Sequence, residues 1–228
     1  MNNVHISGAG TFSGGIYDQV HVSGSAKWNG DIECKEFHVS GAVTGDGNIR
    51  AAEEIHVSGS MKTKGAIDCS GEVHISGSLV AQGNITGCRK LHVSGGIKVH
   101  GDIEAEEVKI SGGGTIEGLL NAEQIEICAG NREGSVRIGG IGGSKVVVKK
   151  PEVFSLFGIA LSMKPSYTQS VVTETIEADE IDLVCTRAAV VRGTNVRIGE
   201  GCVIDRVEYS GTIEHDPSAV IREIVRVA

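Results

Sequence analysis

Histidine recurs at nearly constant spacing along the first part of the chain and is the residue type there with the most chemical potential. Six histidines make up this series: His5, His21, His38, His56, His74 and His92. Imidazole is the commonest metal ligand and a frequent general base. The alternative is a solvated column of rings, which we favour because no carboxylate accompanies every histidine at a fixed offset. The ladder from His21 to His92 is therefore a secondary metal candidate, and we expect no metal and no other cofactor.

Each of these histidines lies inside a repeated motif of the form apolar-His-apolar-Ser-Gly. The motif starts at Val4, Val20, Phe37, Ile55, Val73 and Leu91, and it continues at Val108 with Lys109 in the histidine position. Each period divides into three blocks of about six residues, in which the second position is a large aliphatic and the fourth is apolar or small. Such alternation over a few residues predicts a β-strand, and the glycine that often closes a block supplies freedom for a bend.

Three short strands in each period of about 17–18 residues predict an all-β fold, namely a single-stranded parallel β-helix. The second and fourth positions of each block point inward, so the histidines at third positions point outward and stack at about 4.8 Å. A single coil cannot bury its own apolar face, so stability comes from stacking neighbouring coils.

Differences in the strength of the repeat divide the chain into three segments. We predict regular coils over 1–144, an insertion forming a hairpin or arm over 145–173, and a continuation of the same β-helix with a C-terminal cap over 174–228. The repeat resumes after the insertion because the sequence around Ile176 and Ile181 matches that around Ile103 and Val108.

Composition limits the classes of partner. A net charge of -8 without a basic stripe argues against nucleic-acid binding, which needs a basic face. The N-terminal residues do not form a secretory signal, and no apolar run reaches the roughly 20 residues that span a bilayer, so we expect a cytoplasmic protein. The six cysteines show no Cys-x-x-Cys pair and are interpreted as reduced packing residues.

Three enzymatic or nucleotide-binding alternatives compete with a structural role. A left-handed hexapeptide-repeat acyltransferase would use an outward histidine as general base, and the segment from Val196 to Gly201 resembles one of its hexads. A sugar-cleaving β-helix enzyme would need clustered carboxylates, whereas those here follow strand edges. The glycine-rich run 139–143 lacks the Gly-Lys-Ser order of a phosphate-binding loop, so we expect no nucleotide.

The repeats that read Gly-Asp-Ile-Glu-Cys from Gly30 and Gly-Asp-Ile-Glu-Ala from Gly101 resemble those of the bactofilin family. The resemblance covers most of residues 3–128 and, less strictly, 174–214. It implies a right-handed β-helix that polymerises without nucleotide and acts as a non-enzymatic bacterial cytoskeletal scaffold. Such a scaffold positions client proteins of the cell envelope, cell-shape or motility apparatus, and the inner face of the cell membrane is a second expected location.

Two sets of contact residues follow. The unpaired backbone of the terminal coils can template another copy of the chain. We therefore predict a polymer interface at Val4, Ile6, Phe12, Val220 and Ile224. The insertion is rich in large apolar residues, which predicts a partner or peripheral membrane contact. Its candidate residues are Phe154, Leu156, Phe157, Ile159 and Leu161.

Overall fold

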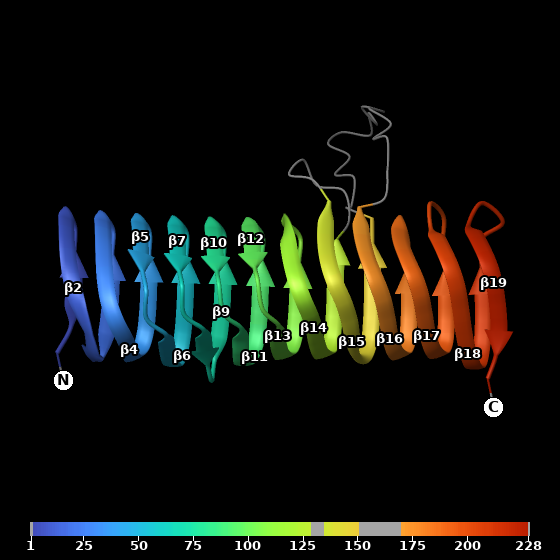
Figure 1. Ribbon diagram of the computed structural model, residues 1–228, viewed down its shortest axis with the longest axis horizontal. Coiled ribbons are helices and arrows are strands. Elements are labelled where there is room, and N and C mark those ends of the chain that lie inside the picture. The colour runs from blue at the N-terminus through green and yellow to red at the C-terminus, as the bar shows by residue number, and fades with distance from the viewer. Residues whose placement is uncertain (1, 129–134, 151–169, 228) are drawn as a thin grey trace, which may run out of the picture.

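The structure, a computed structural model, describes residues 2–128, 135–150 and 170–227. It is all-β, with 77% strand and parallel pairing in a solenoid of about 12 turns, so the predicted parallel β-helix is confirmed. The coils stack in one row, with the N-terminus at one end and the C-terminus at the other (Figure 1). The handedness implied by the family resemblance stays a prediction.

The strands follow one another without an intervening helix in the described residues. They are β1 (Val4–Ile6), β2 (Ala9–Ile16), β3 (Gln19–Val22), β4 (Ser25–Val39), β5 (Ala42–Gly45), β6 (Ile49–Val57), β7 (Ser60–Thr63), β8 (Ile67–Cys69), β9 (Glu72–Ile75), β10 (Ser78–Ala81), β11 (Ile85–Val93), β12 (Gly96–Val99), β13 (Ile103–Ile110), β14 (Gly113–Cys128), β15 (Val136–Lys149), β16 (Val171–Leu183), β17 (Thr186–Ile198), β18 (Val203–His215) and β19 (Val220–Arg226).

The middle coils have the predicted three short strands. In one of them β7, β8 and β9 form three faces, and Ser60 pairs with Ser78 at the equivalent position of the next coil. Towards the C-terminus the strands run around the corners and the coils shorten. Val171 pairs with Thr186, so less chain separates these equivalent positions than separates Ser60 from Ser78. The predicted coil length therefore describes the middle of the solenoid better than its C-terminal part.

The core is a set of inward columns that run along the solenoid axis. Buried residues at the second and fourth block positions alternate with residues that face outward. In β9, for example, Val73 and Ile75 are buried, whereas Glu72 and His74 face outward. Each aliphatic side chain stacks on its equivalents in the coils before and after. Burial at about 25 cal/mol per Å² of apolar surface makes this stacking the main stabilising contribution.

The glycine of the repeated Ser-Gly corner has a different purpose from the one that we predicted. Gly59 has no left-handed backbone conformation. A Cβ added to it would lie 1.9 Å from the carbonyl oxygen of Gly41 in the preceding coil, and the same holds at 1.9 Å for Gly77 against Gly59. Only glycine allows the stacked corners to approach this closely, so the requirement is steric and does not come from bending the backbone.

The predicted boundaries of the insertion were wrong at both ends. β15 continues to Lys149, where Val146 and Val148 are buried and Val146 pairs with Ile125 and with Ile181. β16 starts at Val171, so residues 145–149 and 171–173 belong to the solenoid. The alternating valines of this segment form an ordinary inward-outward strand. Residues 151–169, and with them Phe154, Leu156, Phe157, Ile159 and Leu161, lie outside the described residues.

The predicted C-terminal cap is also wrong for the part of the chain that the structure describes. β19 pairs with β18, and no other described strand pairs with it or covers its free edge.

Candidate functional site

The histidine column forms as predicted on the outer face of the first coils. His5 pairs with His21, and the pairing continues through His38, His56, His74 and His92. Successive ring centroids are 5.0, 6.2, 5.9, 6.1 and 5.9 Å apart. Beyond His92 the same column continues with Lys109 and Glu126, whose side chains form an ion pair at 3.4 Å.

Carboxylates accompany three of these histidines, which was not predicted from the sequence. Glu72 Oε2 lies 3.1 Å from His74 Nε2, and Glu54 Oε1 lies 3.6 Å from His56 Nδ1. Glu36 lies 3.8 Å from His38. Each glutamate stands two positions before its histidine, on the same outer face of the strand. The signal was the spacing of two, which becomes visible once third positions are known to point outward.

The same column was the secondary metal candidate of the sequence. Among the residues that the structure describes, no three His, Cys, Asp or Glu side chains are grouped so as to hold a metal ion. The rings stack along a line, and glutamates lie beside three of them. This is the geometry of a solvated surface ladder.

The last histidine of the column provides a pH prediction. Burial, followed by the nearby charges of His74 and Lys109, lowers the pKa of His92. An unfolded chain therefore takes up more protons at this position as the pH falls, so its contribution to stability is present above about pH 6.5 and declines below it. We expect His92→Gln to flatten the fall in unfolding free energy between pH 7.5 and 5.5, measured by urea titration. His21→Gln controls for loss of an imidazole, and identical pH slopes for wild type and His92→Gln would contradict the prediction.

The cysteines are packing residues, as predicted. All six are free, and five of them are buried. Burial raises the pKa of Cys34 to about 12 and that of Cys202 to about 11. Such thiols carry little thiolate near neutral pH, so they are poor nucleophiles.

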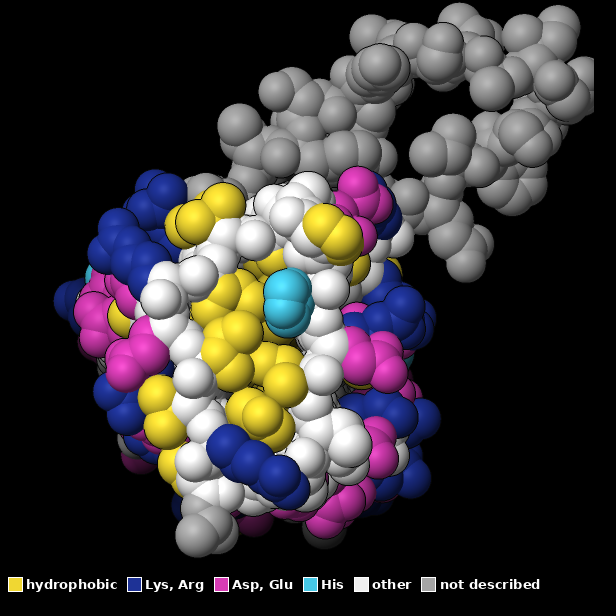
Figure 2. All heavy atoms as spheres, turned by 90° about the vertical axis from the view of Figure 1, so that its right-hand side faces the viewer, with side chains coloured by type: hydrophobic (Ala, Val, Ile, Leu, Met, Phe, Trp, Pro, Cys, Tyr) yellow, Lys and Arg dark blue, Asp and Glu magenta, His cyan; other side chains and the backbone are white. Residues whose placement is uncertain are grey.

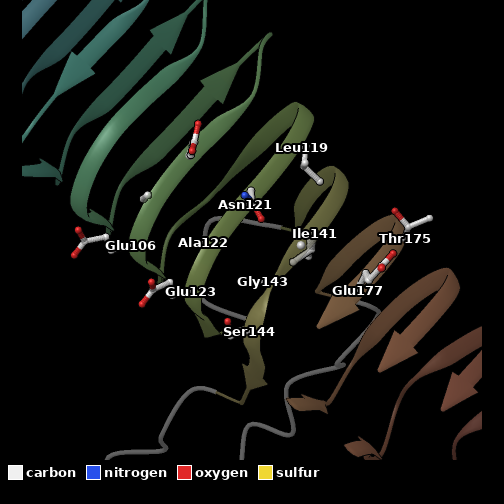
Figure 3. A pocket seen from close by; sticks show the side chains of 13 residues that line it. Glu106, Leu119, Asn121, Ala122, Glu123, Ile141, Gly143, Ser144, Thr175 and Glu177 are labelled. Carbon is white, nitrogen blue, oxygen red and sulfur yellow. The ribbon is translucent and has the colours of Figure 1, made fainter. Parts of the chain in front are cut away.

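The glycine-rich run lies in β15 and forms the floor of a shallow hollow on the outside of the solenoid. Figure 3 shows Ile141, Gly143 and Ser144 below Leu119 and Asn121 of β14. The hollow has a volume of roughly 710 Å³, and its lining includes the carboxylates of Glu104, Glu106, Glu123 and Glu177. Four carboxylates repel a phosphate group, which supports the expectation that this run does not bind nucleotide.

The N-terminal end of the solenoid exposes the first turn of the core. Val4 and Ile6 lie in β1 and Phe12 lies in β2, and all three side chains are half-buried against the core. In the described residues, β1 pairs with β3 and β2 pairs with β4, and no strand pairs with their other edges. These three predicted interface residues therefore lie together at an open end.

The C-terminal end is open in the same way. Figure 2 shows hydrophobic side chains gathered in the middle of this end and ringed by backbone, with charged side chains towards the periphery. Ile224 stacks on the buried Val207 and is 43% exposed. Val220 instead pairs with Val203 on the outer face. Ile221, which was not among the predicted residues, stacks inward on the buried Ile204.

The described residues contain no helix long and apolar enough to cross a bilayer.

These features define an all-β solenoid whose two ends are uncovered in the described residues, and comparison with known proteins identifies its family. A model of the bactofilin family, described as polymer-forming cytoskeletal, matches residues 1–71 and 56–150. The chain belongs to the bactofilin family. This is a structural, polymer-forming cytoskeletal family. The match therefore favours a structural role over the acyltransferase alternative.

Two Bacillus subtilis proteins are similar to parts of the chain. The uncharacterized protein YhbF is 39% identical over 83 residues, which are 36% of this chain and 32% of YhbF. The uncharacterized protein YhbE is 52% identical over 48 residues, which are 21% of this chain and 20% of YhbE. The chain thus matches a third or less of the length of these relatives. No solved structure matches the chain significantly.

Proposed function

We propose that the chain is a non-enzymatic scaffold whose copies stack end to end, coil on coil, into filaments without nucleotide. The observation that carries this proposal is the pair of open ends. Each end presents a free strand edge around exposed core side chains, Ile6 and Phe12 at one end and Ile221 and Ile224 at the other. A free edge with apolar side chains beside it is a template for pairing with another copy.

The chemistry of the surroundings supports assembly without nucleotide. The glycine-rich strand is bordered by carboxylates rather than by basic groups. The contacts available at the ends are backbone hydrogen bonds and aliphatic stacking, the same interactions that join coils within one chain. End contacts of this kind need no hydrolysis to form.

The filament is proposed to position proteins of the envelope, cell-shape or motility apparatus in the cytoplasm, in part at the inner face of the membrane. The apolar residues of 151–169 are the proposed client or membrane contact. β15 ends at Lys149 before this segment, and β16 starts at Val171 after it. β15 and β16 lie within the row of coils, with β17, β18 and β19 between them and the C-terminal end (Figure 1).

Assembly of the purified chain in nucleotide-free buffer tests this function. We expect thin filaments by negative-stain microscopy, with a sedimentable fraction that does not change on addition of ATP or GTP with magnesium. About 12 turns at about 4.8 Å each predict an axial repeat of roughly 58 Å, or twice that if copies alternate in direction. A chain that stays monomeric at high concentration would remove the mechanism.

A further inference from the structure

One inward column changes character at its final position. Its members stack from coil to coil along the histidine face, one position beyond each outward histidine or its equivalent. They are Ile6, Val22, Val39, Val57, Ile75, Val93, Ile110, Ile127, Val148, Leu183, Ile198 and, in the last coil, His215. Every member before the last is aliphatic. The titratable member stands in the last coil of this column, on which no described strand stacks.

In the single chain this imidazole is exposed. His215 pairs with Ile198, which is fully buried, so the ring lies over the end of the core. The space-filling view of this end shows a histidine side chain among the central hydrophobic ones (Figure 2). Its apolar neighbours in the last coil are Ile213 and Ile221, which also occupy inward positions. A molecule that covered the end would therefore bury the imidazole in an apolar setting.

Among the described residues, the carboxylates nearest to this position either have other partners or point to the outer face. Asp216 is the nearest carboxylate in sequence, and its Oδ1 accepts hydrogen bonds from Ser218 N at 2.8 Å and from Ser218 Oγ at 2.6 Å. These hydrogen bonds lower the pKa of Asp216, and His215 contributes less to this shift than they do. Glu214 points to the outer face, where Arg197 is its register partner in the preceding coil and forms an ion pair with Asp182 at 3.8 Å. Glu200 forms an ion pair with Lys150.

A docked copy would bring further charges according to the end that it presents. The first coil, residues 2–17, contains no Asp or Glu. Its single histidine, His5, lies on the outer face. The last coil of another copy would bring its own Glu214, Asp216 and Arg222. In the first case no carboxylate of the docked coil can offset a buried imidazolium.

We infer that His215 makes the C-terminal end a pH-gated docking surface for a second copy of the chain, which binds when the imidazole is neutral and is released when it is protonated. The inference rests on the end-to-end assembly proposed above. A neutral imidazole can enter an apolar contact with one ring nitrogen hydrogen-bonded, whereas burial of the cation without a partner is strongly unfavourable. Imidazoles change charge between about pH 5 and 8, so the gate operates in that range.

The test compares the critical concentration for assembly at pH 7.5 and pH 5.5 by sedimentation of the full chain, with far-UV circular dichroism at both pH values to confirm folding. The wild type is expected to need at least about fivefold more protein at pH 5.5, because a protonated imidazole opposes burial at this end. Two variants remove the titratable ring: His215→Leu extends the aliphatic column, and His215→Gln is polar but uncharged. The critical concentration of each should differ less than about twofold between the two pH values. His56→Gln, on the outer ladder, should keep the wild-type response.

The outcomes separate this inference from the proposed function. Filaments with the same pH response in wild type and in both His215 variants, or with no pH response in the wild type, overturn the gate and leave end-to-end assembly standing. Absence of filaments in every variant at both pH values overturns the proposed function and the gate together.

Discussion

Replacement of both Ile221 and Ile224 with aspartate is expected to abolish filament formation while the chain stays folded. Both side chains occupy inward columns at the open end, where another copy would bury them. An aspartate there must lose its hydration when the copies join, and this cost opposes association directly. We expect the critical concentration to rise at least a hundredfold, equivalent to about 2.7 kcal/mol. Sedimentation and negative-stain microscopy measure the loss.

The same strand provides a matched control. Val220 lies next to Ile221 but points to the outer face, where it is 56% exposed. Val220→Asp should therefore leave filaments nearly unchanged. Equal loss of filaments in Val220→Asp and in the inward pair would mean that charge near the end, and not burial in the column, limits assembly.

The corresponding pair at the other end is Val4→Asp with Ile6→Asp, which block the first coil. The two blocked chains together report how copies are oriented. If like ends join, each blocked chain alone stops at dimers through its intact end. If unlike ends join, each alone stays monomeric and a mixture of the two forms dimers. Mass photometry distinguishes these cases.

The repeat allowed the fold to be predicted because each period carries the same inward-outward pattern. Residues such as Val73, His74 and Ile75 alternate in every coil, and a pattern repeated this often outweighs ambiguity in any one strand. The inward columns, the outward histidines and the half-buried Val4, Ile6 and Phe12 were therefore predictable. The residues at the end of the first coil were predictable because the histidine motif sets the register there.

Features that occur once in the chain could not be predicted in the same way. Lys145 to Lys149 were assigned to an insertion, although their inward-outward alternation is preserved in β15. Gly114 pairs with Val136, and more chain separates these two than separates Ile97 from Gly114 in the coil before. That coil therefore carries extra residues, which were not predicted because a corner that lengthens leaves no periodic signal.

A shift of one position explains the error at the C-terminal end. Val220 and Ile221 are adjacent β-branched aliphatic residues at the start of the last strand, and the sequence there does not show which of them points inward. Neighbouring residues of a strand point to opposite faces, so choosing the wrong one of the two exchanges an inward side chain for an outward one. The histidine motif, which fixes the register in the first coils, is absent here.

A glycine at an inward position is the other kind of exception. Gly45 occupies the fourth position of its block, where the equivalent residues of the following coils are Thr63 and Ala81. Its partner in the preceding coil is Trp28, the single tryptophan of the chain, which is 1% exposed. A Cβ added to Gly45 would lie 1.9 Å from two carbon atoms of the indole ring. The glycine therefore makes room for a side chain that would otherwise be too large for the narrow interior.

Gly45→Ala is accordingly expected to destabilise the fold by about 3 kcal/mol, at the upper end of the range for overpacked cores. The indole cannot move aside easily, because it also contacts Phe12 at 6.4 Å and Phe37 at 6.0 Å between ring centroids. Urea unfolding followed by circular dichroism measures the loss, and tryptophan emission reports the displaced ring directly. Gly96→Ala is the control, since the nearest atom to its added Cβ is Ser78 Oγ at 3.9 Å. A similar loss in Gly96→Ala would show that strand glycines in general, and not the indole contact, set the cost.

The double variant decides whether the two positions form one packing unit. Trp28→Val alone should cost about 3–5 kcal/mol, because it leaves a cavity above Gly45. In Trp28→Val with Gly45→Ala the added methyl group enters that cavity, so the combined cost should fall below the sum of the single costs by at least about 1 kcal/mol. Trp28→Phe should cost much less than Trp28→Val, because the indole Nε1 has no hydrogen-bond partner within the described structure and a phenyl ring keeps most of the contact. Strict additivity would mean that the core near the N-terminal end relaxes around either change. The tryptophan and the glycine would then be independent features of neighbouring coils.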